Sequence, residues 1–341
     1  MGSRAAVDVT PERIMQFAWA YAPTFILEAA IRHRVFDFLD EGPKTVEEVS
    51  AAAAVSVRGL RSIMNALVGL ELLARNADGR YSLTPESSRF LVSAKPGFLG
   101  GMLRHTSSQL VPKWMELDEI VRSGRPAKAV NHQDVGEDFF RQFVADIFPM
   151  SYPSAQALAN ELRLAEAAGP VSVLDLAAGS GVWSIALAQK SPHVRVTAVD
   201  WPGVLTATKA MVSSFGLLDR YRFVAGDLHS ADFGTDHDIA TLGHILHSEG
   251  EKSSRALLRK TWEALASGGT IAIGEILVDE NRRESVLGLI FAVNMLVNTE
   301  FGDTFTFREI SAWLRDAGFE NPRTLDVPGP SPLILAGKPR I

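Results

Sequence analysis

One short stretch indicates the fold of this chain: Val173-Leu174-Asp175-Leu176-Ala177-Ala178-Gly179-Ser180-Gly181. An apolar run typical of a strand ends in a loop of small residues, and a helical pattern opens directly after it. Glycine lets a backbone turn tightly and approach a ligand closely, while the first turn of a helix offers unpaired N–H groups. The stretch therefore predicts a strand–loop–helix unit with a ligand at the loop. Alone it is weak evidence, because many α/β folds need a tight turn at this point.

The sequence around this loop alternates short apolar runs with helical patterns. We expect strands at Val171–Leu176, Val194–Val199, Tyr221–Ala225, Ile239–Leu242 and Thr270–Ile276, separated by helices at Trp183–Gln189, Leu205–Phe215 and Ser254–Leu265. After these we expect helices at Glu284–Val297 and Phe307–Ala317, then strands at Pro322–Asp326 and Leu333–Gly337. The alternation predicts an α/β fold with parallel βαβ units in a doubly wound, Rossmann-like sheet.

Acidic residues end the second and third predicted strands. Asp200 stands roughly twenty residues beyond the loop, where such folds place an acid that accepts the hydroxyls of a ribose. Asp227 ends the next strand, close to the point where the strand order reverses. The third glycine of the dinucleotide fingerprint is missing, which favours a single nucleoside over a dinucleotide. The plainer alternatives are a turn residue for Asp200 and a helix cap for Asp227.

A candidate base follows the fourth predicted strand. His247 stands at a carboxyl strand end, and a histidine can take a proton from a hydroxyl near neutral pH. Glu275 ends the neighbouring strand, where it can orient the imidazole, or it is simply a surface acid. We interpret His244 as a core histidine. A metal site on the two histidines is a further alternative, but the nearby acids show no clear ligand pattern.

The first part of the chain has a different pattern. Short helices, one opened by a capping box of Thr45 and Glu48, precede a hairpin signal at Asp78-Gly79, which is the outline of a winged helix. The helix before the wing carries no basic stripe, so we expect a packing or dimerisation module and no nucleic-acid partner. We expect domains at 1–95 (winged helix), 96–165 (helical, around the acceptor pocket) and 166–341 (catalytic).

The composition narrows the class of protein. At about 150 residues per domain, 341 residues predict two domains rather than one. The absence of cysteine excludes disulfides, thiolate metal sites and a cysteine nucleophile. A net charge of 34 − 40 = −6 gives no attraction to nucleic acid or anionic membranes. We find no secretory signal and no span, since Glu28 interrupts the apolar run Ala22–Ile31, and we expect a cytoplasmic protein.

Taken in order, these motifs resemble one family. The chain is similar to the dimeric, S-adenosylmethionine-dependent O-methyltransferases of class I, typified by plant caffeate and flavonoid enzymes and bacterial hydroxyneurosporene methyltransferases. The matching motifs are Asp175–Gly181, Asp200-Trp201-Pro202, Gly226-Asp227, Ile245-Leu246-His247, Gly268-Gly269, Glu275 and Ala317-Gly318-Phe319. The chain departs from the family in having Ala177-Ala178 where glycine is usual, and Ser248-Glu249 where Asp-Trp follows the base.

The resemblance implies a site and a reaction. S-adenosyl-L-methionine would lie against the loop and leave as S-adenosyl-L-homocysteine, with Asp200 on its ribose and Asp227-Leu228 beside its adenine. The implied cofactor residues are Asp175, Ala177, Gly179, Gly181, Asp200, Trp201, Gly226, Asp227, Leu228 and Gly243. The implied catalytic residues are His247 as the general base and Glu275 beside it, with Asp303 in the region of a second acid.

The resemblance also implies a homodimer through the N-terminal domain and a small-molecule acceptor, with no metal. We expect the acceptor, a phenolic hydroxyl of a secondary metabolite, to be surrounded by Phe139, Phe143, Phe148, Met150, Phe291, Asn294, Met295 and Asn298. Core packing is the alternative for each of these residues. A relative that binds the same cofactor without transferring a methyl group, and N- or C-methylation, also stay open.

Overall fold

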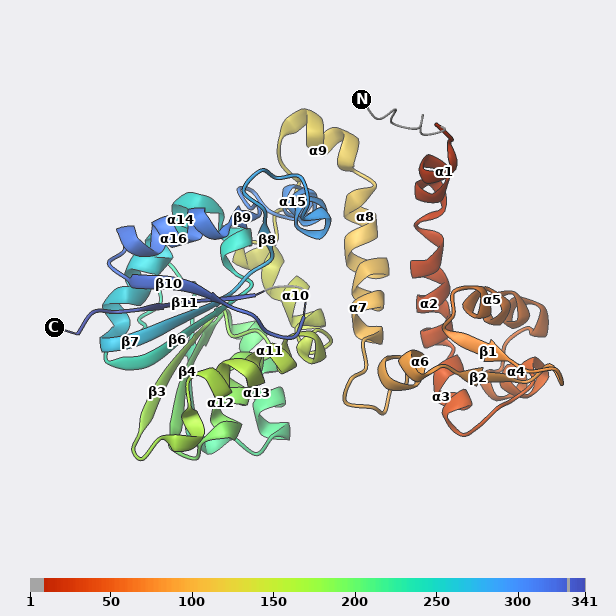
Figure 1. The fold of residues 1–341 in the computed structure, drawn as a ribbon, viewed down its shortest axis with the longest axis horizontal. Coiled ribbons are helices and arrows are strands. Elements are labelled where there is room, and N and C mark those ends of the chain that lie inside the picture. The colour runs from red at the N-terminus through yellow and green to blue at the C-terminus, as the bar shows by residue number, and fades with distance from the viewer. Residues whose placement is uncertain (1–8, 330–331, 341) are drawn as a thin grey trace, which may run out of the picture. The chain divides into compact units, whose positions relative to one another are not determined.

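A computed structural model describes residues 9–329 and 332–340 in two compact units, one up to Leu110 and one from Val111 onward. We treat each unit by itself. The expected middle domain, 96–165, does not form a unit of its own. Its first helix, α7 (Gly100–His105), packs on α2 (Ala22–Arg32) of the first unit, while α8 (Val111–Trp114) packs on α15 (Val286–Asn298) of the second (Figure 1). The apolar faces of this segment thus belong to two different cores.

The first unit has the predicted winged-helix outline. Its elements are α1 (Glu12–Trp19), α2, α3 (Val35–Asp40), α4 (Val46–Ala53), α5 (Val57–Gly69), β1 (Leu73–Arg75), β2 (Tyr81–Leu83), α6 (Pro85–Phe90), α7 and a π-helical turn, η1 (Thr106–Leu110). The predicted capping box is present, since Glu48 N–H donates to Thr45 Oγ1 at 3.2 Å and Thr45 N–H donates to Glu48 Oε2 at 2.6 Å. The hairpin pairs Leu73 with Leu83 around a left-handed Gly79.

A row of apolar side chains on the first two helices faces solvent. The exposed large residues there are Ile14, Met15, Phe17, Trp19, Tyr21 and Phe25. By length and composition alone, Glu12–Arg32 could also cross a membrane, although only 6% of that window is buried within the molecule. No span was predicted here, because the apolar run Ala22–Ile31 is interrupted by Glu28. An exposed apolar row of this size indicates a surface that is covered by a partner.

The second unit is built on a seven-stranded sheet in the order β10-β11-β7-β6-β3-β4-β5. The strands are β3 (Val171–Leu176), β4 (Val194–Asp200), β5 (Tyr221–Ala225), β6 (His237–Gly243), β7 (Leu265–Gly274), β10 (Glu320–Leu325) and β11 (Leu333–Gly337). The five strands from β3 to β7 are parallel, as predicted, and β11 pairs antiparallel with both β7 and β10. The chain therefore has the expected α/β class, with an antiparallel hairpin added at one edge.

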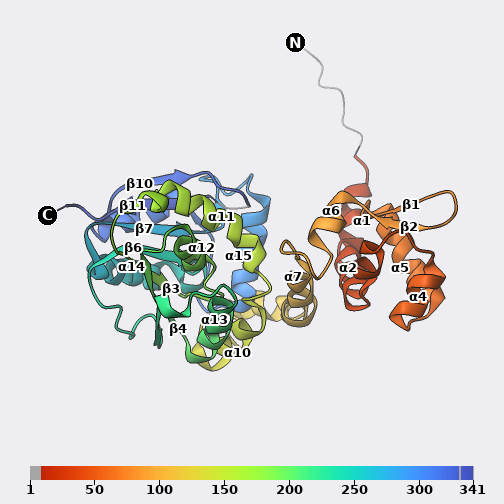
Figure 2. The same cartoon turned by 90° about the horizontal axis from the view of Figure 1, so that it is seen from below.

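Helices cover both faces of this sheet, which can be followed in Figure 2. One apolar core joins α11 (Phe148–Glu161) and α12 (Val182–Lys190) to residues such as Val173 and Val196. The other core joins α14 (Leu246–Ala264) and α16 (Phe307–Asp316) to residues such as Leu174 and Leu242. Successive residues of β3 thus point into opposite cores, which explains why the strand reads as a continuous apolar run.

The remaining elements of the second unit lie between or beside these layers. They are α8, α9 (Leu117–Ser123), α10 (Gln133–Phe143), the 3₁₀ turns η2 (Leu164–Glu166) and η3 (Leu218–Arg220), α13 (Pro202–Ser214), α15, β8 (Leu277–Val278) and β9 (Phe305–Thr306). The short parallel pair β8–β9 was not predicted. Helix α14 starts at Leu246, eight residues before the predicted Ser254, because a left-handed Gly250 joins two helical segments that the sequence pattern separates.

Candidate active site

The glycine loop closes the carboxyl end of β3 in a left-handed path. Ala177, Gly179 and Gly181 all have positive φ values, of 50°, 54° and 75°. The Gly179 N–H donates to Asp200 Oδ2 at 2.8 Å, and the Gly179 carbonyl accepts from Thr208 Oγ1 at 2.7 Å. The loop is therefore fixed on both sides. Since glycine reaches such φ values without strain, the two glycines that the sequence singled out are required by the backbone itself.

Asp175, near the end of β3, precedes this loop and anchors the strand to neighbouring elements by hydrogen bonds. The side chain has no exposed surface, and its oxygens accept hydrogen bonds from Thr241 Oγ1 at 2.7 Å and from the Ser184 hydroxyl. Burial raises the pKa of this carboxyl to about 6, although the two hydroxyls lower it. A carboxylate so enclosed cannot reach a bound cofactor with its side chain. Its contribution is to hold β6 and the start of α12 against β3.

Asp200 and Asp227 lie together at the ends of β4 and β5. Asp200 Oδ1 also accepts the Trp201 N–H at 2.7 Å, and burial raises the pKa of its carboxyl to about 7. The Trp201 indole N–H donates to Asp227 Oδ2 at 3.4 Å, and the Gly226 N–H donates to the Asp200 carbonyl at 3.0 Å. Leu228, by contrast, turns its side chain into the core and is 8% exposed.

This group of residues fits the cofactor that the resemblance implies. Two half-buried carboxylates offer acceptors for ribose hydroxyls and an adenine amine, and an indole offers a flat apolar surface beside them. Above Gly179 a β-carbon would meet nothing nearer than 3.6 Å, so the loop leaves room where a ligand must approach the backbone. Gly243 lies under the Trp183 indole, whose Nε1 would be 1.8 Å from a β-carbon there, so its part in the site is to admit that ring.

His247 and Glu275 form a buried pair. His247 Nδ1 lies 2.6 Å from Glu275 Oε2, and Glu275 Oε1 accepts the N–H groups of Leu246 at 2.7 Å and His247 at 3.3 Å. Burial alone would raise the pKa of the Glu275 carboxyl, but the charge of His247 and its hydrogen bonds bring it below the usual value. An ionised carboxylate only accepts hydrogen bonds, so Nδ1 carries a proton, and whenever the imidazole is neutral its Nε2 keeps a free lone pair.

His244 lies next to this pair in a left-handed conformation, with φ at 59°. Its ring is 6.1 Å from the ring of His247, and burial lowers its pKa. Ligand atoms of His244, His247 and Glu275 lie within 4.8 Å of one another, which is a possible metal geometry. His247 Nδ1 and Glu275 Oε2 already pair with each other through a hydrogen bond, which does not require a metal. A site without a metal is therefore still our prediction.

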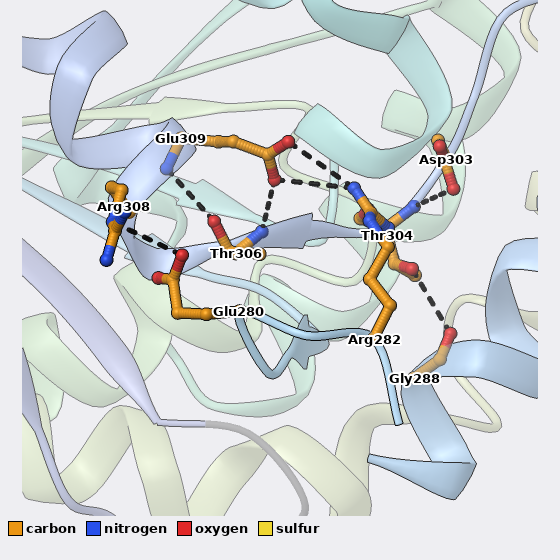
Figure 3. A network of polar contacts seen from close by, with 8 residues as sticks. All are labelled: Glu280, Arg282, Gly288, Asp303, Thr304, Thr306, Arg308 and Glu309. Carbon is orange, nitrogen blue, oxygen red and sulfur yellow. Dashed lines mark hydrogen bonds and ion pairs between the residues drawn. The ribbon is translucent and has the colours of Figure 1, made fainter. Parts of the chain in front are cut away.

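The loop before β9 holds the backbone of His247. The Asp303 N–H donates to the His247 carbonyl at 2.9 Å, while the Asp303 carboxylate accepts the Thr304 N–H at 2.7 Å. A network from Arg282 to Thr304 and Glu309 ties this loop to α16, and Figure 3 shows Asp303 at its edge, turned toward Thr304. Among the described contacts, Asp303 therefore reaches the candidate base through its backbone N–H, whereas the resemblance places a side-chain acid in this region.

The departure Ser248-Glu249 also has a structural role. Glu249 Oε2 lies 2.7 Å from His229 Nε2, and the His229 N–H donates to Asp227 Oδ1 at 2.9 Å. The hydrogen bond to Glu249 raises the pKa of His229. This pair connects the segment of the candidate base to the loop of the candidate cofactor acid.

The eight residues expected around the acceptor lie on three helices, α15, α10 and α11. Phe291 on α15 packs edge-on against the His247 ring at 4.9 Å, and Asn294, Met295 and Asn298 continue that helix. Phe139 and Phe143 form a ring cluster on α10. Phe148 is instead a core residue, stacked on Phe215 at 5.5 Å, and Met150 is 38% exposed on α11. The sequence pattern could not separate these roles, because a core helix and a pocket wall carry the same apolar residues.

Three residues near the site escaped the sequence analysis. Trp183 covers Gly243 and Gly274, Trp114 Nε1 donates to Asn294 Oδ1 at 3.0 Å, and Lys113 Nζ lies 5.0 Å over the Phe139 ring. Lys113 and Trp114 on the short helix α8 match no sequence motif, so the sequence alone offered no reason to place them at the site. Only the packing of α8 on α15 reveals that they approach the candidate site.

Together the fold and the site define a class I, nucleoside-binding α/β enzyme with a histidine–carboxylate pair beside the cofactor loop. The comparisons with known proteins agree with this. A family model described as the O-methyltransferase domain matches residues 114–320, and a second, described as the O-methyltransferase dimerisation domain, matches residues 15–93. The chain belongs to this family and is an S-adenosylmethionine-dependent O-methyltransferase.

The chain is similar over nearly its whole length to characterised relatives. It is 31% identical to the tetracenomycin polyketide synthesis 8-O-methyl transferase of Streptomyces glaucescens, over 97% of both chains. It is 30% identical to the 3-hydroxy-5-methyl-1-naphthoate 3-O-methyltransferase of Streptomyces sahachiroi, over 94% of this chain and 92% of that protein. Human N-acetylserotonin methyltransferase, solved in complex with S-adenosylmethionine, superposes with a TM-score of 0.84 at 25% identity, over 98% of this chain and 100% of that one.

Proposed function

We propose that this methyltransferase methylates an aromatic hydroxyl of a small molecule, with His247 as the general base. The observation that carries the proposal is the 2.6 Å contact between His247 Nδ1 and the buried Glu275 carboxylate. This contact leaves Nε2 free to take a proton from the acceptor hydroxyl. Glu275 holds the ring in place and stabilises the positive charge that the ring gains.

The other residues bind and position the reactants. When bound, S-adenosylmethionine supplies a methyl group made electrophilic by its sulfonium centre. We assign its ribose to Asp200, its adenine to the region of Asp227 and Trp201, and its amino-acid part to the loop around Gly179. Because no protein nucleophile is required, holding two reactants in line accounts for most of the rate, together with the exclusion of water.

Aromatic side chains and the relatives support an aromatic acceptor. Phe291 stands against the candidate base, and Phe139 and Phe143 cluster on α10, so a flat ring has apolar surfaces to pack on. One relative is named for a hydroxynaphthoate, which is an aromatic acid, and another is named for an 8-O-methyl transfer in tetracenomycin polyketide synthesis. Another, from Streptomyces rimosus, is named an N,N-dimethyltransferase at 28% identity, so an amine acceptor is the second candidate.

The N-terminal unit supports a homodimer. It matches the dimerisation domain of the family, and α1 and α2 present the exposed row Ile14, Met15, Phe17, Trp19, Tyr21 and Phe25. We propose that a second copy covers this row. A membrane is the other candidate partner, because Glu12–Arg32 passes the length and composition test for a span. As the relatives are biosynthetic enzymes, we propose a soluble, cytoplasmic protein without a nucleic-acid partner.

The test is methyl transfer from S-adenosylmethionine labelled in its methyl group. The purified protein is incubated with matched phenols, anilines and carbon acids, and the products are separated and identified. We expect label on the oxygen of aromatic hydroxyls. Label found only on nitrogen or carbon would show that the acceptor atom is not oxygen. Consumption of an acceptor without label in the product would refute methyl transfer.

A further inference from the structure

A buried ammonium group lies close to the candidate acceptor site. The Nζ atom of Lys113 has almost no exposed surface and no hydrogen-bond partner among the described residues. Its described contact is with an aromatic face, the Phe139 ring at 5.0 Å. Burial lowers the pKa of this ammonium, and the nearest contributing acid, Glu116, is exposed and makes no described hydrogen bond to it. A desolvated cation without a hydrogen bond costs folding free energy unless something else compensates it.

The same wall contains a second unsatisfied group. Trp114, next to Lys113, donates to Asn294 Oδ1 at 3.0 Å, and Asn298 Nδ2 donates to the same oxygen at 3.1 Å. Asn298 is 2% exposed, yet its own Oδ1 has no partner among the described residues. An unpaired acceptor, Asn298 Oδ1, thus belongs to this small network, and an unpaired donor, Lys113 Nζ, belongs to the residue next to Trp114. Native proteins leave few such groups, and each requires a reason.

This network is connected to the candidate base. Phe291, Asn294 and Asn298 follow one another on successive turns of α15, so they share a face of that helix. Phe291 packs on the His247 ring at 4.9 Å, Asn294 receives Trp114, and Lys113 reaches Phe139 on α10. A molecule with its hydroxyl at His247 and its ring beside Phe291 would therefore extend toward Lys113.

We propose that Lys113 binds an anionic oxygen on the acceptor, separate from the hydroxyl that is methylated. The preferred acceptors are then aromatic hydroxyls that carry a second acidic group, either a carboxylate or an ionised enol. Such an oxygen gives the buried ammonium the charge-assisted hydrogen bond that it lacks. The proposal rests on the proposed function, since it assumes that the acceptor binds beside His247.

Equilibrium binding tests this independently of catalysis. The wild-type protein, loaded with S-adenosylhomocysteine, is titrated in a calorimeter with hydroxynaphthoate and its methyl ester, and separately with a naphthoquinone that carries one acidic enol and one phenolic hydroxyl and with its O-methyl ether at the enol. We expect at least one acidic member to bind about tenfold to a hundredfold more tightly than its neutral partner. The pair that shows the difference identifies the source of the anionic oxygen.

Two variants locate the effect. Lys113→Met removes the charge and keeps the length, so the preference should disappear while the neutral partners bind as before, and Lys113→Arg should keep part of it. The control is Lys209→Met, because Lys209 also lies over a ring, that of Phe223 at 5.2 Å, but is exposed on α13. Circular dichroism establishes that each variant is folded.

Three outcomes overturn the proposal: equal affinity within both wild-type pairs, no binding of any probe, or an unchanged preference in Lys113→Met. A charge-dependent preference without methyl transfer would support Lys113 and count against the proposed reaction. Methyl transfer without a charge-dependent preference would support the proposed reaction and count against the role of Lys113. The two proposals can therefore fail separately.

Discussion

At the scale of single residues, the proposed function depends on which nitrogen of His247 carries a proton. The Glu275 carboxylate fixes the proton of His247 on Nδ1, and the N–H groups of Leu246 and His247 hold that carboxylate in turn. The sequence singled out both side chains as candidates from their places near strand ends. It could not show that the carboxylate would be buried, at 2% exposure, and held by the N–H groups of Leu246 and His247, because those contacts join two segments distant in the chain.

Replacing Glu275 with glutamine tests this positioning role. An amide can donate to Nδ1 and so favour the opposite tautomer, in which Nε2 carries the proton and cannot act as a base. We expect kcat to fall by about a hundredfold or more, with the Kd of S-adenosylhomocysteine unchanged. Glu300→Gln is the matched control, since Glu300 makes an exposed 3.0 Å pair with His132. Equal losses of activity in both variants would show that Glu275 has no specific role in positioning His247.

The carboxyl of Asp200 predicts a pH dependence of cofactor binding. Its pKa is raised to about 7, above the usual value, so it is largely ionised only in the alkaline part of the physiological range. Ribose hydroxyls donate to the ionised form, and protonation removes that acceptor. The Kd of S-adenosylhomocysteine should therefore rise as the pH falls through about 7, with proton release on binding. Calorimetry in buffers of different ionisation enthalpy measures both effects.

The variant Asp200→Asn provides the control for this dependence. It keeps an oxygen acceptor but does not titrate, so its binding should be weaker at alkaline pH and nearly independent of pH. A wild-type protein whose affinity is constant across this range would show that Asp200 does not accept from the cofactor.

At the scale of elements, the turn that carries His247 is held by close backbone contacts. At Gly302 a β-carbon would lie 2.4 Å from the His247 carbonyl and 2.3 Å from Thr299 Oγ1. The loop and the base can approach each other only because this position has no side chain. No sequence motif marks Gly302, since the requirement comes from two segments that are distant in the chain.

The variant Gly302→Ala should therefore displace His247 while the sheet stays intact. We expect a loss of methyl transfer of at least tenfold, near-normal circular dichroism and a lower melting temperature. Gly169→Ala is the control, because a β-carbon there meets nothing within 4 Å. If Gly302→Ala were as active as Gly169→Ala, the backbone contact would be irrelevant to the base.

Elements with a strong local pattern were predictable. The bounds of β3, β5 and β11 agree with those predicted, because each strand is a short, largely apolar run between residues that break the pattern. The pair β8–β9 and the early start of α14 were missed, since two-residue strands have no periodicity and Gly250 interrupts the helical pattern. Phe148 was expected at the acceptor, although its side chain lies in the core, because a core helix and a pocket wall carry the same apolar residues.

At the scale of the whole molecule, we predict a dimer held by the first unit. The double variant Ile14→Glu/Phe17→Glu places two charges on the exposed row, at 72% and 66% exposed positions. We expect the wild type to sediment as a dimer and the variant as a monomer, while Val121→Glu, an exposed position on α9, stays dimeric. A monomeric wild type that cosediments with lipid vesicles would indicate a membrane as the partner instead.

The central claim is that His247 is the base of a methyl transfer to oxygen. The most direct measurement compares wild type and His247→Ala for label transfer to an aromatic hydroxyl, with the Kd of S-adenosylhomocysteine measured on the same samples. We predict a loss of transfer of about a hundredfold to ten-thousandfold with an almost unchanged Kd. Full activity in the variant, or a loss explained by failure to bind the cofactor, would contradict the claim.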